Sequence, residues 1–133
     1  MTTQFIDPTK YLVYRKNGSQ EECPIKTKLI IVPTATPQTL SPSTSAKKMK
    51  VMYLYGQSNA TTSTGVINIQ NDTSGGTLLL AAGLPARDSS TGPWQMPYQP
   101  IGHFETEAAG DDLYFSSSVQ NVFVYLQYIE YTP

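Results

Sequence analysis

The strongest constraint on the fold of this chain is the recurrence of short β-forming segments between turn residues. The predicted segments are 10–16, 26–32, 48–55, 65–70, 78–82, 101–106, 112–117 and 121–131. No stretch repeats apolar residues at helical spacing over three turns. About eight strands at this spacing predict an all-β fold, an antiparallel β-sandwich of jelly-roll-like form. The length of 133 residues suits a single domain over residues 1–133.

Alternation along the segments predicts which side chains share a face. Met49, Val51 and Tyr53 are expected on one face of their strand, and the Asn17-Gly18 pair predicts a tight turn. The last segment is apolar on both faces, with Val122, Val124 and Leu126 on one and Phe123, Tyr125 and Ile129 on the other. A strand of this kind is either central in its sheet or has one face against another subunit.

Residues 33–45 differ from the predicted strands, because they hold three prolines and seven Ser or Thr residues and no charge. Proline removes a backbone donor and blocks ladder hydrogen bonds. We therefore expect an extended Pro/Ser/Thr-rich loop or arm rather than a packed element. Contact with another subunit would be its main source of order.

Charge is scarce and unevenly distributed. Charged residues make up 14% of the chain, against about 25% in an average domain. Residues 1–50 carry eight Lys or Arg and three acids, whereas residues 51–133 carry one Arg and seven acids. This split is either ordinary scatter or a pair of complementary patches between neighbouring subunits. Lys47, Lys48 and Lys50 are too few for a phosphate footprint, so we expect no nucleic acid as partner.

The sequence also argues against membrane insertion and secretion. No apolar run approaches the roughly 20 residues of a membrane-spanning helix, so we expect no membrane partner. The first residues lack the basic and apolar regions of a signal peptide, which indicates synthesis in the cytoplasm.

Titratable and nucleophilic residues give no catalytic or metal-binding pattern. Cys23 has no partner for a disulfide within the chain, and Glu21 and Glu22 beside it disfavour its thiolate. His103 has no neighbours at metal-ligand spacing. The acids Glu105, Glu107, Asp111 and Asp112 crowd one segment. They suit acid–base work on a sugar, a Ca²⁺ site or a solvated turn, and the solvated turn is our expectation. No cofactor is predicted.

Gly56-Gln57-Ser58-Asn59 follows an apolar strand and resembles the nucleophile block of SGNH-type esterases. The resemblance implies a serine that attacks an ester. That family also needs a downstream Asp-x-x-His, but Pro100 stands three residues before His103. Its parallel α/β fold does not match this chain either, so we expect that the protein is not an enzyme.

Aromatic residues supply the candidate interface: Trp94, Tyr98, Phe104, Phe123 and Tyr125. Three of them, Trp94, Tyr98 and Phe104, lie in or near a proline-rich segment. If buried, they plug the sandwich. If exposed, they anchor a protein interface or stack on sugar rings, since Trp and Tyr are frequent at binding hot spots.

The C-terminal half resembles the decoration (cement) and head-fibre proteins of tailed phages, in texture rather than in a fixed motif. The resemblance lies in low charge, many threonines and an apolar, Tyr-rich last strand, and it runs through residues 81–85, 102–104, 112–117 and 122–129. It implies a homo-oligomer that binds the major capsid protein, and a trimer is the first expectation for its oligomeric state.

We therefore expect a non-enzymatic virion structural protein on the capsid surface. Its action would be to cement adjacent capsid subunits. The alternative is a carbohydrate-binding module or fibre domain that recognises host glycans through Trp94 and tyrosines.

Overall fold

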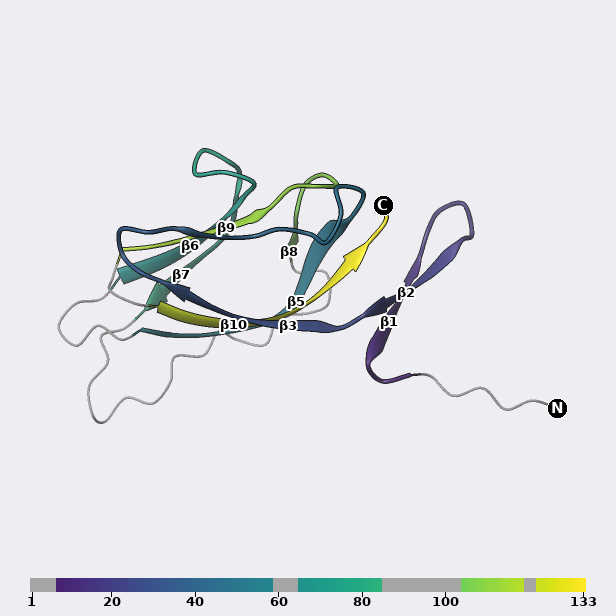
Figure 1. Ribbon diagram of the computed structural model, residues 1–133, viewed down its shortest axis with the longest axis horizontal. Coiled ribbons are helices and arrows are strands. Elements are labelled where there is room, and N and C mark those ends of the chain that lie inside the picture. Colours follow the sequence, from purple (N-terminus) through teal and green to yellow (C-terminus); the bar gives the residue numbers. More distant parts are fainter. Residues whose placement is uncertain (1–6, 59–64, 85–103, 119–121) are drawn as a thin grey trace.

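A computed structural model describes residues 7–58, 65–84, 104–118 and 122–133, and these residues form strands and turns without a helix (Figure 1). The ten strands are β1 (Lys10–Tyr14), β2 (Gln20–Pro24), β3 (Lys26–Val32), β4 (Gln38–Leu40), β5 (Lys48–Ser58), β6 (Gly65–Asn71), β7 (Leu78–Leu84), β8 (Phe104–Glu105), β9 (Leu113–Ser117) and β10 (Val122–Tyr131). The predicted all-β antiparallel sandwich is confirmed. The sandwich itself has the expected eight strands, β3 to β10, although the eight predicted segments include β1 and leave out β2 and β4.

The two larger sheets have the strand order of a jelly roll. One sheet has the order β3-β10-β5-β8 and the other the order β4-β9-β6-β7. The chain therefore pairs its strands in nested fashion, with β3 beside β10, β4 beside β9, β5 beside β8 and β6 beside β7, all antiparallel. Such nesting arises when one long antiparallel pair of strands is rolled into two facing sheets. Figure 1 shows these sheets as two layers, with β6 and β9 in one and β3 and β10 in the other.

The hydrophobic core lies between the two layers, and the alternation of inward and outward side chains along the strands builds it. The first sheet contributes the inward row Val122, Val124 and Leu126 of β10, all buried. The second sheet contributes the buried side chains Ile67, Ile69, Leu113 and Phe115. Because β10 lies between β3 and β5, the central position expected from its two apolar faces is confirmed.

A register shift in β5 changes which of its side chains face the core. The ladder between β10 and β5 pairs Gln127 with Tyr53 and the next residue, Tyr128, with Val51. Met52 is therefore the extra residue of a β-bulge. Met49 and Val51 are buried as predicted, but Tyr53 faces outward and Leu54 is buried instead. The expectation that Tyr53 shares a face with Met49 and Val51 is wrong, because the bulge reverses the alternation.

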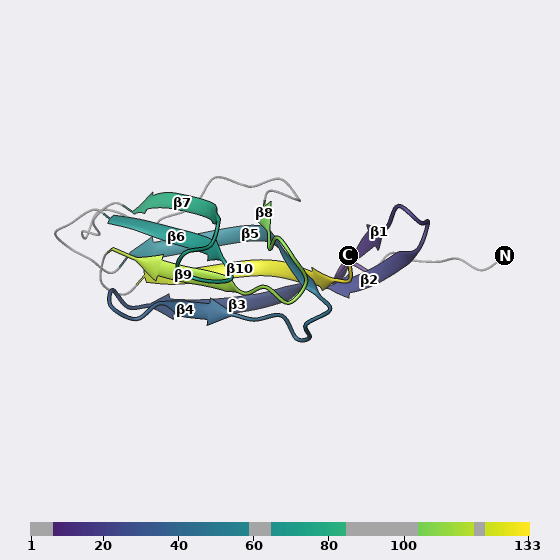
Figure 2. The same cartoon turned by 90° about the horizontal axis from the view of Figure 1, so that it is seen from above.

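Strands β1 and β2 form a separate two-stranded sheet, which Figures 1 and 2 both show beyond one end of the sandwich. The predicted turn at Asn17-Gly18 closes this hairpin. Gly18 has a φ of 85°, a conformation that glycine adopts without steric cost. The amide of Arg15 donates to the carbonyl of Ser19 at 2.9 Å, and the Asn17 side chain accepts from the Ser19 amide at 3.0 Å.

Three residues of the segment 33–45 form a strand of the sandwich, and residues 33–37 and 41–45 on either side of it form no strand. Its strand β4 pairs with β9, and Leu40 is 8% exposed and belongs to the core. The expectation that this segment contains no packed element is therefore wrong for Gln38–Leu40. The prolines lie outside β4, so they leave its ladder hydrogen bonds intact.

A buried carboxylate fixes the same segment to the end of β10. Glu130 accepts hydrogen bonds from the amide and the hydroxyl of Ser43, both at 2.7 Å, and forms an ion pair with Lys26. Burial alone would raise the pKa of Glu130, but Lys26 and Ser43 outweigh it and hold the pKa below its ordinary value. The charged carboxylate thus joins β3, β10 and the segment 33–45 at one end of the sandwich.

Candidate docking surface

The outer face of the first sheet carries an apolar and aromatic surface across three adjacent strands. Ladder pairing places Ile31 of β3 beside Phe123 of β10, and Leu29 beside Tyr125, which in turn is beside Tyr55 of β5. Tyr53 follows on β5, opposite Gln127. We call this set the β3-β10-β5 face: Leu29, Ile31, Tyr53, Tyr55, Phe123 and Tyr125.

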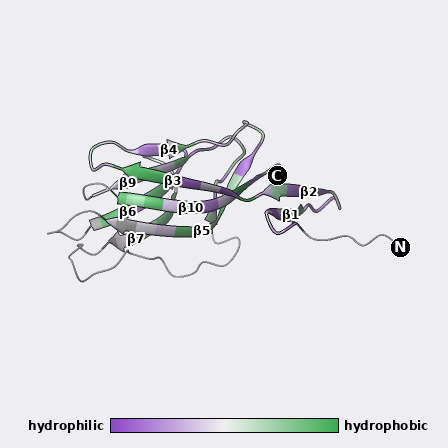
Figure 3. Cartoon of the chain, turned by 60° about the horizontal axis from the view of Figure 1, so that its bottom comes forward, coloured by the Kyte–Doolittle hydropathy of each residue, from purple (hydrophilic) through white to green (hydrophobic). Residues whose placement is uncertain are grey.

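Two aliphatic side chains of this face are unusually exposed. Leu29 is 58% exposed and Ile31 is 48% exposed, whereas the four aromatic residues are partly buried. Figure 3 shows the hydrophobic ends of β3 and β10 side by side. Because β3 is an edge strand of its sheet, the exposed apolar row also borders a ladder edge that no strand of the described chain covers. Uncovered edges and contiguous apolar surface are typical of places where another chain binds.

The outer face of the second sheet is different in chemistry. Its outward residues include the polar Thr39, Asn68 and Ser116 and the aromatic Tyr114. Val66 and Leu78 are its exposed branched aliphatic residues, at 40% and 54%. The two outer faces of the sandwich are therefore not equivalent. On the β3-β10-β5 face, aliphatic and aromatic side chains lie beside one another in the ladders, whereas Val66 lies beside Gly83 and Leu78 beside Gln70.

The strands of the β3-β10-β5 face also bear a positive charge. They hold four lysines against one acid, Glu130. Lys26 pairs with Glu130, and Lys48 lies 3.4 Å from Glu105. Lys28 and Lys50 form no ion pair with any residue that the structure describes. Lys50 pairs with Ile129 and so lies on the outer side of the sheet, whereas Lys28 pairs with the inward Leu126. One basic side chain of this face thus remains available to an acidic partner.

The structure brings together only part of the predicted interface. Phe123 and Tyr125 lie side by side with the exposed aliphatic residues, as the doubly apolar last strand suggested. Phe104 is buried in the core opposite Val51, so its proposed place in an interface is wrong, because the short strand β8 turns it inward. Trp94 and Tyr98 lie outside the described residues.

Four members of the face were missed from the sequence. Leu29 and Ile31 belong to the continuous apolar run 29–32, which has no alternation to mark an outward row. Tyr53 and Tyr55 face outward because of the bulge at Met52, and no local sequence pattern predicts this bulge. The pairing of these strands with β10 is what assembles the surface.

Ser58, the residue of the esterase-like block, ends β5 and is 2% exposed. A nucleophile must reach its substrate, and this hydroxyl is enclosed by protein. Asn59 and His103 lie outside the described residues.

The acidic segment is organised by hydrogen bonds around Asn71, which is buried. The side-chain Nδ2 of Asn71 donates to the carboxylate of Asp111 at 2.8 Å, and its side-chain Oδ1 accepts from the backbone amide of Glu107 at 2.8 Å. Asp112 interacts with Asp72 through the backbone, and Glu105 binds Tyr131 and Lys48. Burial and the Glu105 carboxylate raise the pKa of Tyr131 well above its ordinary value. Among the described residues, no three His, Cys, Asp or Glu side chains are placed to hold a metal ion.

Cys23 is 1% exposed and lies in β2. Burial, and then the negative charge of Glu21, raise the pKa of this thiol. The prediction that Cys23 is a poor nucleophile agrees with this direction.

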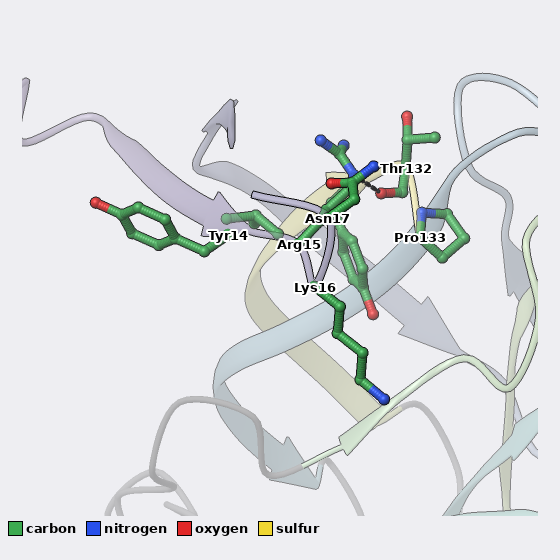
Figure 4. Close-up of a pocket in the computed structure, with 8 residues that line it drawn as sticks. Tyr14, Arg15, Lys16, Asn17, Thr132 and Pro133 are labelled. Carbon is green, nitrogen blue, oxygen red and sulfur yellow. Dashed lines mark hydrogen bonds between the residues drawn. The ribbon is translucent and has the colours of Figure 1, made fainter. Parts of the chain in front are cut away.

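An open pocket of about 440 Å³ lies between the hairpin turn and the C-terminal residues (Figure 4). Arg15, Lys16 and Asn17 line it from one side, and Thr132 and Pro133 from the other. The Nε of Arg15 donates to the carbonyl of Thr132 at 2.7 Å. The pocket therefore lies at the junction between the hairpin and the sandwich, which this hydrogen bond from Arg15 to Thr132 joins.

Comparison with known proteins yields no relative. No protein-family model, no curated protein and no solved structure matches this chain. In the described part of the chain, no helix has the length and apolar character needed to cross a membrane.

Proposed function

We propose that this protein is a non-enzymatic structural protein that binds another protein surface through its β3-β10-β5 face. The observation that carries the proposal is the exposure of Leu29 and Ile31 beside Phe123, Tyr125 and Tyr55. Apolar side chains with an aromatic cluster, on rigid paired strands, are what a stable interface uses at its centre.

The setting that fits best is the surface of a phage head, where the partner is the major capsid protein. Two arguments support this setting: the resemblance of the C-terminal half to decoration proteins, and a jelly-roll strand order, which is common in viral coat domains. The second is an analogy of fold alone, and fold does not determine function. The available Lys50 on the same face favours an acidic capsid surface.

Mass spectrometry of purified particles tests the setting directly, because a decoration protein is present in stoichiometric amounts. The binding face is tested by adding variants to heads stripped of this protein. The double variant Leu29→Ser with Ile31→Ser should lose about 2–4 kcal/mol of binding free energy from apolar burial, a roughly 30- to 800-fold weaker Kd.

Val66→Ser is the matched control, because it makes the same kind of change at an exposed residue of the opposite sheet. It should bind like the parent. Equal binding by the Leu29/Ile31 double variant and the parent would rule out this face as the contact, whatever the particle composition shows.

A second candidate function is recognition of glycans. Tyr53, Tyr55 and Tyr125 lie on adjacent strands of one face, and flat tyrosine clusters can stack on sugar rings; jelly rolls also include lectins. A glycan array separates the two proposals. Saturable glycan binding that Tyr55→Ala and Tyr125→Ala abolish, and that Leu29→Ser leaves intact, would favour the glycan function over protein docking.

A further inference from the structure

The β1-β2 hairpin is joined to the rest of the molecule by a very short connection. Strand β2 ends at Pro24 and β3 begins at Lys26, so Ile25 alone lies between them. The hairpin shares no ladder with either sheet of the sandwich, and it lies beyond one end of it (Figure 2). A two-stranded hairpin of this size is marginal by itself in water, so it needs a surface on which to pack.

That surface is built from residues distant in the sequence, and we call it the arm seat: Lys47, Ile129 and Thr132. The Glu21 carboxylate forms ion pairs with Lys47 of the seat and with Arg15 of the hairpin itself, and it accepts from the amide of Thr132 at 2.9 Å. Arg15 donates back to the carbonyl of Thr132 (Figure 4).

Buried side chains on β10 and β2 accompany these polar contacts. Ile129 points to the outer face of the first sheet, like Phe123 and Tyr125, yet it is fully buried. Strand β2 contacts β10, and Cys23 of β2 is buried too. Both residues lie outside the main core cluster, so the hairpin covers one end of a face that is otherwise exposed.

We propose that the β1-β2 hairpin is an exchangeable arm, which leaves its own seat and occupies the same seat on a second copy of the chain. The contacts that hold the arm to Lys47, Ile129 and Thr132 are identical in the two arrangements. Only the path of the chain through Ile25 decides which seat is taken. Exchange of an identical element through a short hinge is a low-cost route to association between copies, and it needs no new interface. This inference does not depend on the proposed function.

The test uses the unaltered protein and a zero-length carbodiimide, which joins the carboxylate and the amine of an ion pair. Unlabelled and nitrogen-15-labelled chains are unfolded, mixed, refolded at high concentration and then cross-linked. If arms exchange, mass spectrometry finds the Glu21–Lys47 cross-linked peptide with one labelled and one unlabelled half. A dilute refolding should contain this mixed peptide at a much lower level.

The ion pair of Lys26 with Glu130 is the internal control, because both of its residues follow the Ile25 hinge. Its cross-linked peptide should stay unmixed. A Glu21–Lys47 peptide that is unmixed at every concentration overturns the proposal. Mixing at both pairs also overturns it, because β3 would then exchange together with the hairpin.

A charge-reversed pair of variants gives a second, independent readout. One chain carries Arg15→Glu with Glu21→Lys, which keeps an ion pair inside the arm, and the other carries Lys47→Glu. Each variant alone places like charges between arm and seat, whereas a mixed pair restores attraction in both seats. Native mass spectrometry should show a heterodimer in the mixture and mostly single chains in each variant alone. A mixture that contains only the species of its separate components contradicts exchange.

Discussion

At the scale of single residues, the turn after β6 has a position that only glycine can occupy. A Cβ added at Gly76 would lie 1.7 Å from the carbonyl oxygen of Asn71, which is backbone, whereas a Cβ at Gly75 meets no atom within 4 Å. The backbone around Asn71 would have to move, and Asn71 organises the acidic turn. We expect Gly76→Ala to cost about 2–4 kcal/mol of unfolding free energy. Gly75→Ala should stay within about 1 kcal/mol of the parent. Denaturant unfolding measures both, and similar stability of the two variants would show that the turn adjusts freely.

Glu130 should make the stability of the fold depend on pH in the acid range. Its pKa lies below the ordinary value of 4.5 in the folded state. The unfolded chain therefore binds the proton more readily, and the carboxylate contributes stability above pH 4.5 that is lost as the pH falls through the lower folded value. Glu130→Gln should cost roughly 1–3 kcal/mol at pH 7, and the gap between variant and parent should narrow below pH 4.5.

Glu22→Gln is the control for this experiment. Its side chain is 69% exposed and lies 3.4 Å from Lys10, and exposed pairs contribute at most about 1 kcal/mol. A gap between Glu130→Gln and the parent that stays constant from pH 7 down to pH 2 would contradict a role for the charged carboxylate.

At the scale of elements, β4 tests whether the segment 33–45 holds the sandwich together. Leu40 is buried in the core and its neighbour Thr39 is exposed. Leu40→Ala should lower the unfolding free energy by about 2–4 kcal/mol, because it removes three buried carbon atoms and leaves a cavity. Thr39→Ala should change it by less than about 0.5 kcal/mol. Thermal and denaturant unfolding report both values. If Leu40→Ala were as mild as Thr39→Ala, β4 would be peripheral to the core.

The strands that could be predicted from sequence are those with a two-residue apolar period or a continuous apolar run. β2 was not predicted because its residues, Gln20–Pro24, are mostly polar. Its ladder is with β1, across the Asn17-Gly18 turn. β4 was not predicted because it has only three residues and prolines lie close on both sides of it. Phe123 and Tyr125 were found because a strand apolar on both faces is informative in itself.

Other features of the surface depend on information that no local pattern contains. The outward position of Tyr53 follows from a bulge defined by pairing with β10. The exposure of Leu29 and Ile31 follows from the edge position of β3. Strand order is a property of long-range pairing, so such assignments require the assembled sheet.

At the scale of the whole molecule, the jelly roll and its hairpin should behave as two units of different stability. β10 is paired on both sides and packs in the core. The hairpin has a ladder of its own and is held by the Glu21 contacts and the buried Cys23. Segments with few buried side chains open locally at lower free energy than the core.

Hydrogen exchange followed by NMR measures this difference amide by amide. Hairpin amides of β1 and β2 should exchange at least about tenfold faster than those of β10, because local opening of the hairpin leaves the sandwich intact. Glu21→Gln removes the carboxylate that binds both Lys47 and Thr132. It should therefore speed exchange in the hairpin and in residues next to Thr132, while β6 and β9 keep the rates of the parent. Equal acceleration in β6, β9 and the hairpin would mean that the molecule opens as one cooperative unit, and that the Glu21 contacts stabilise the whole fold rather than the position of the hairpin.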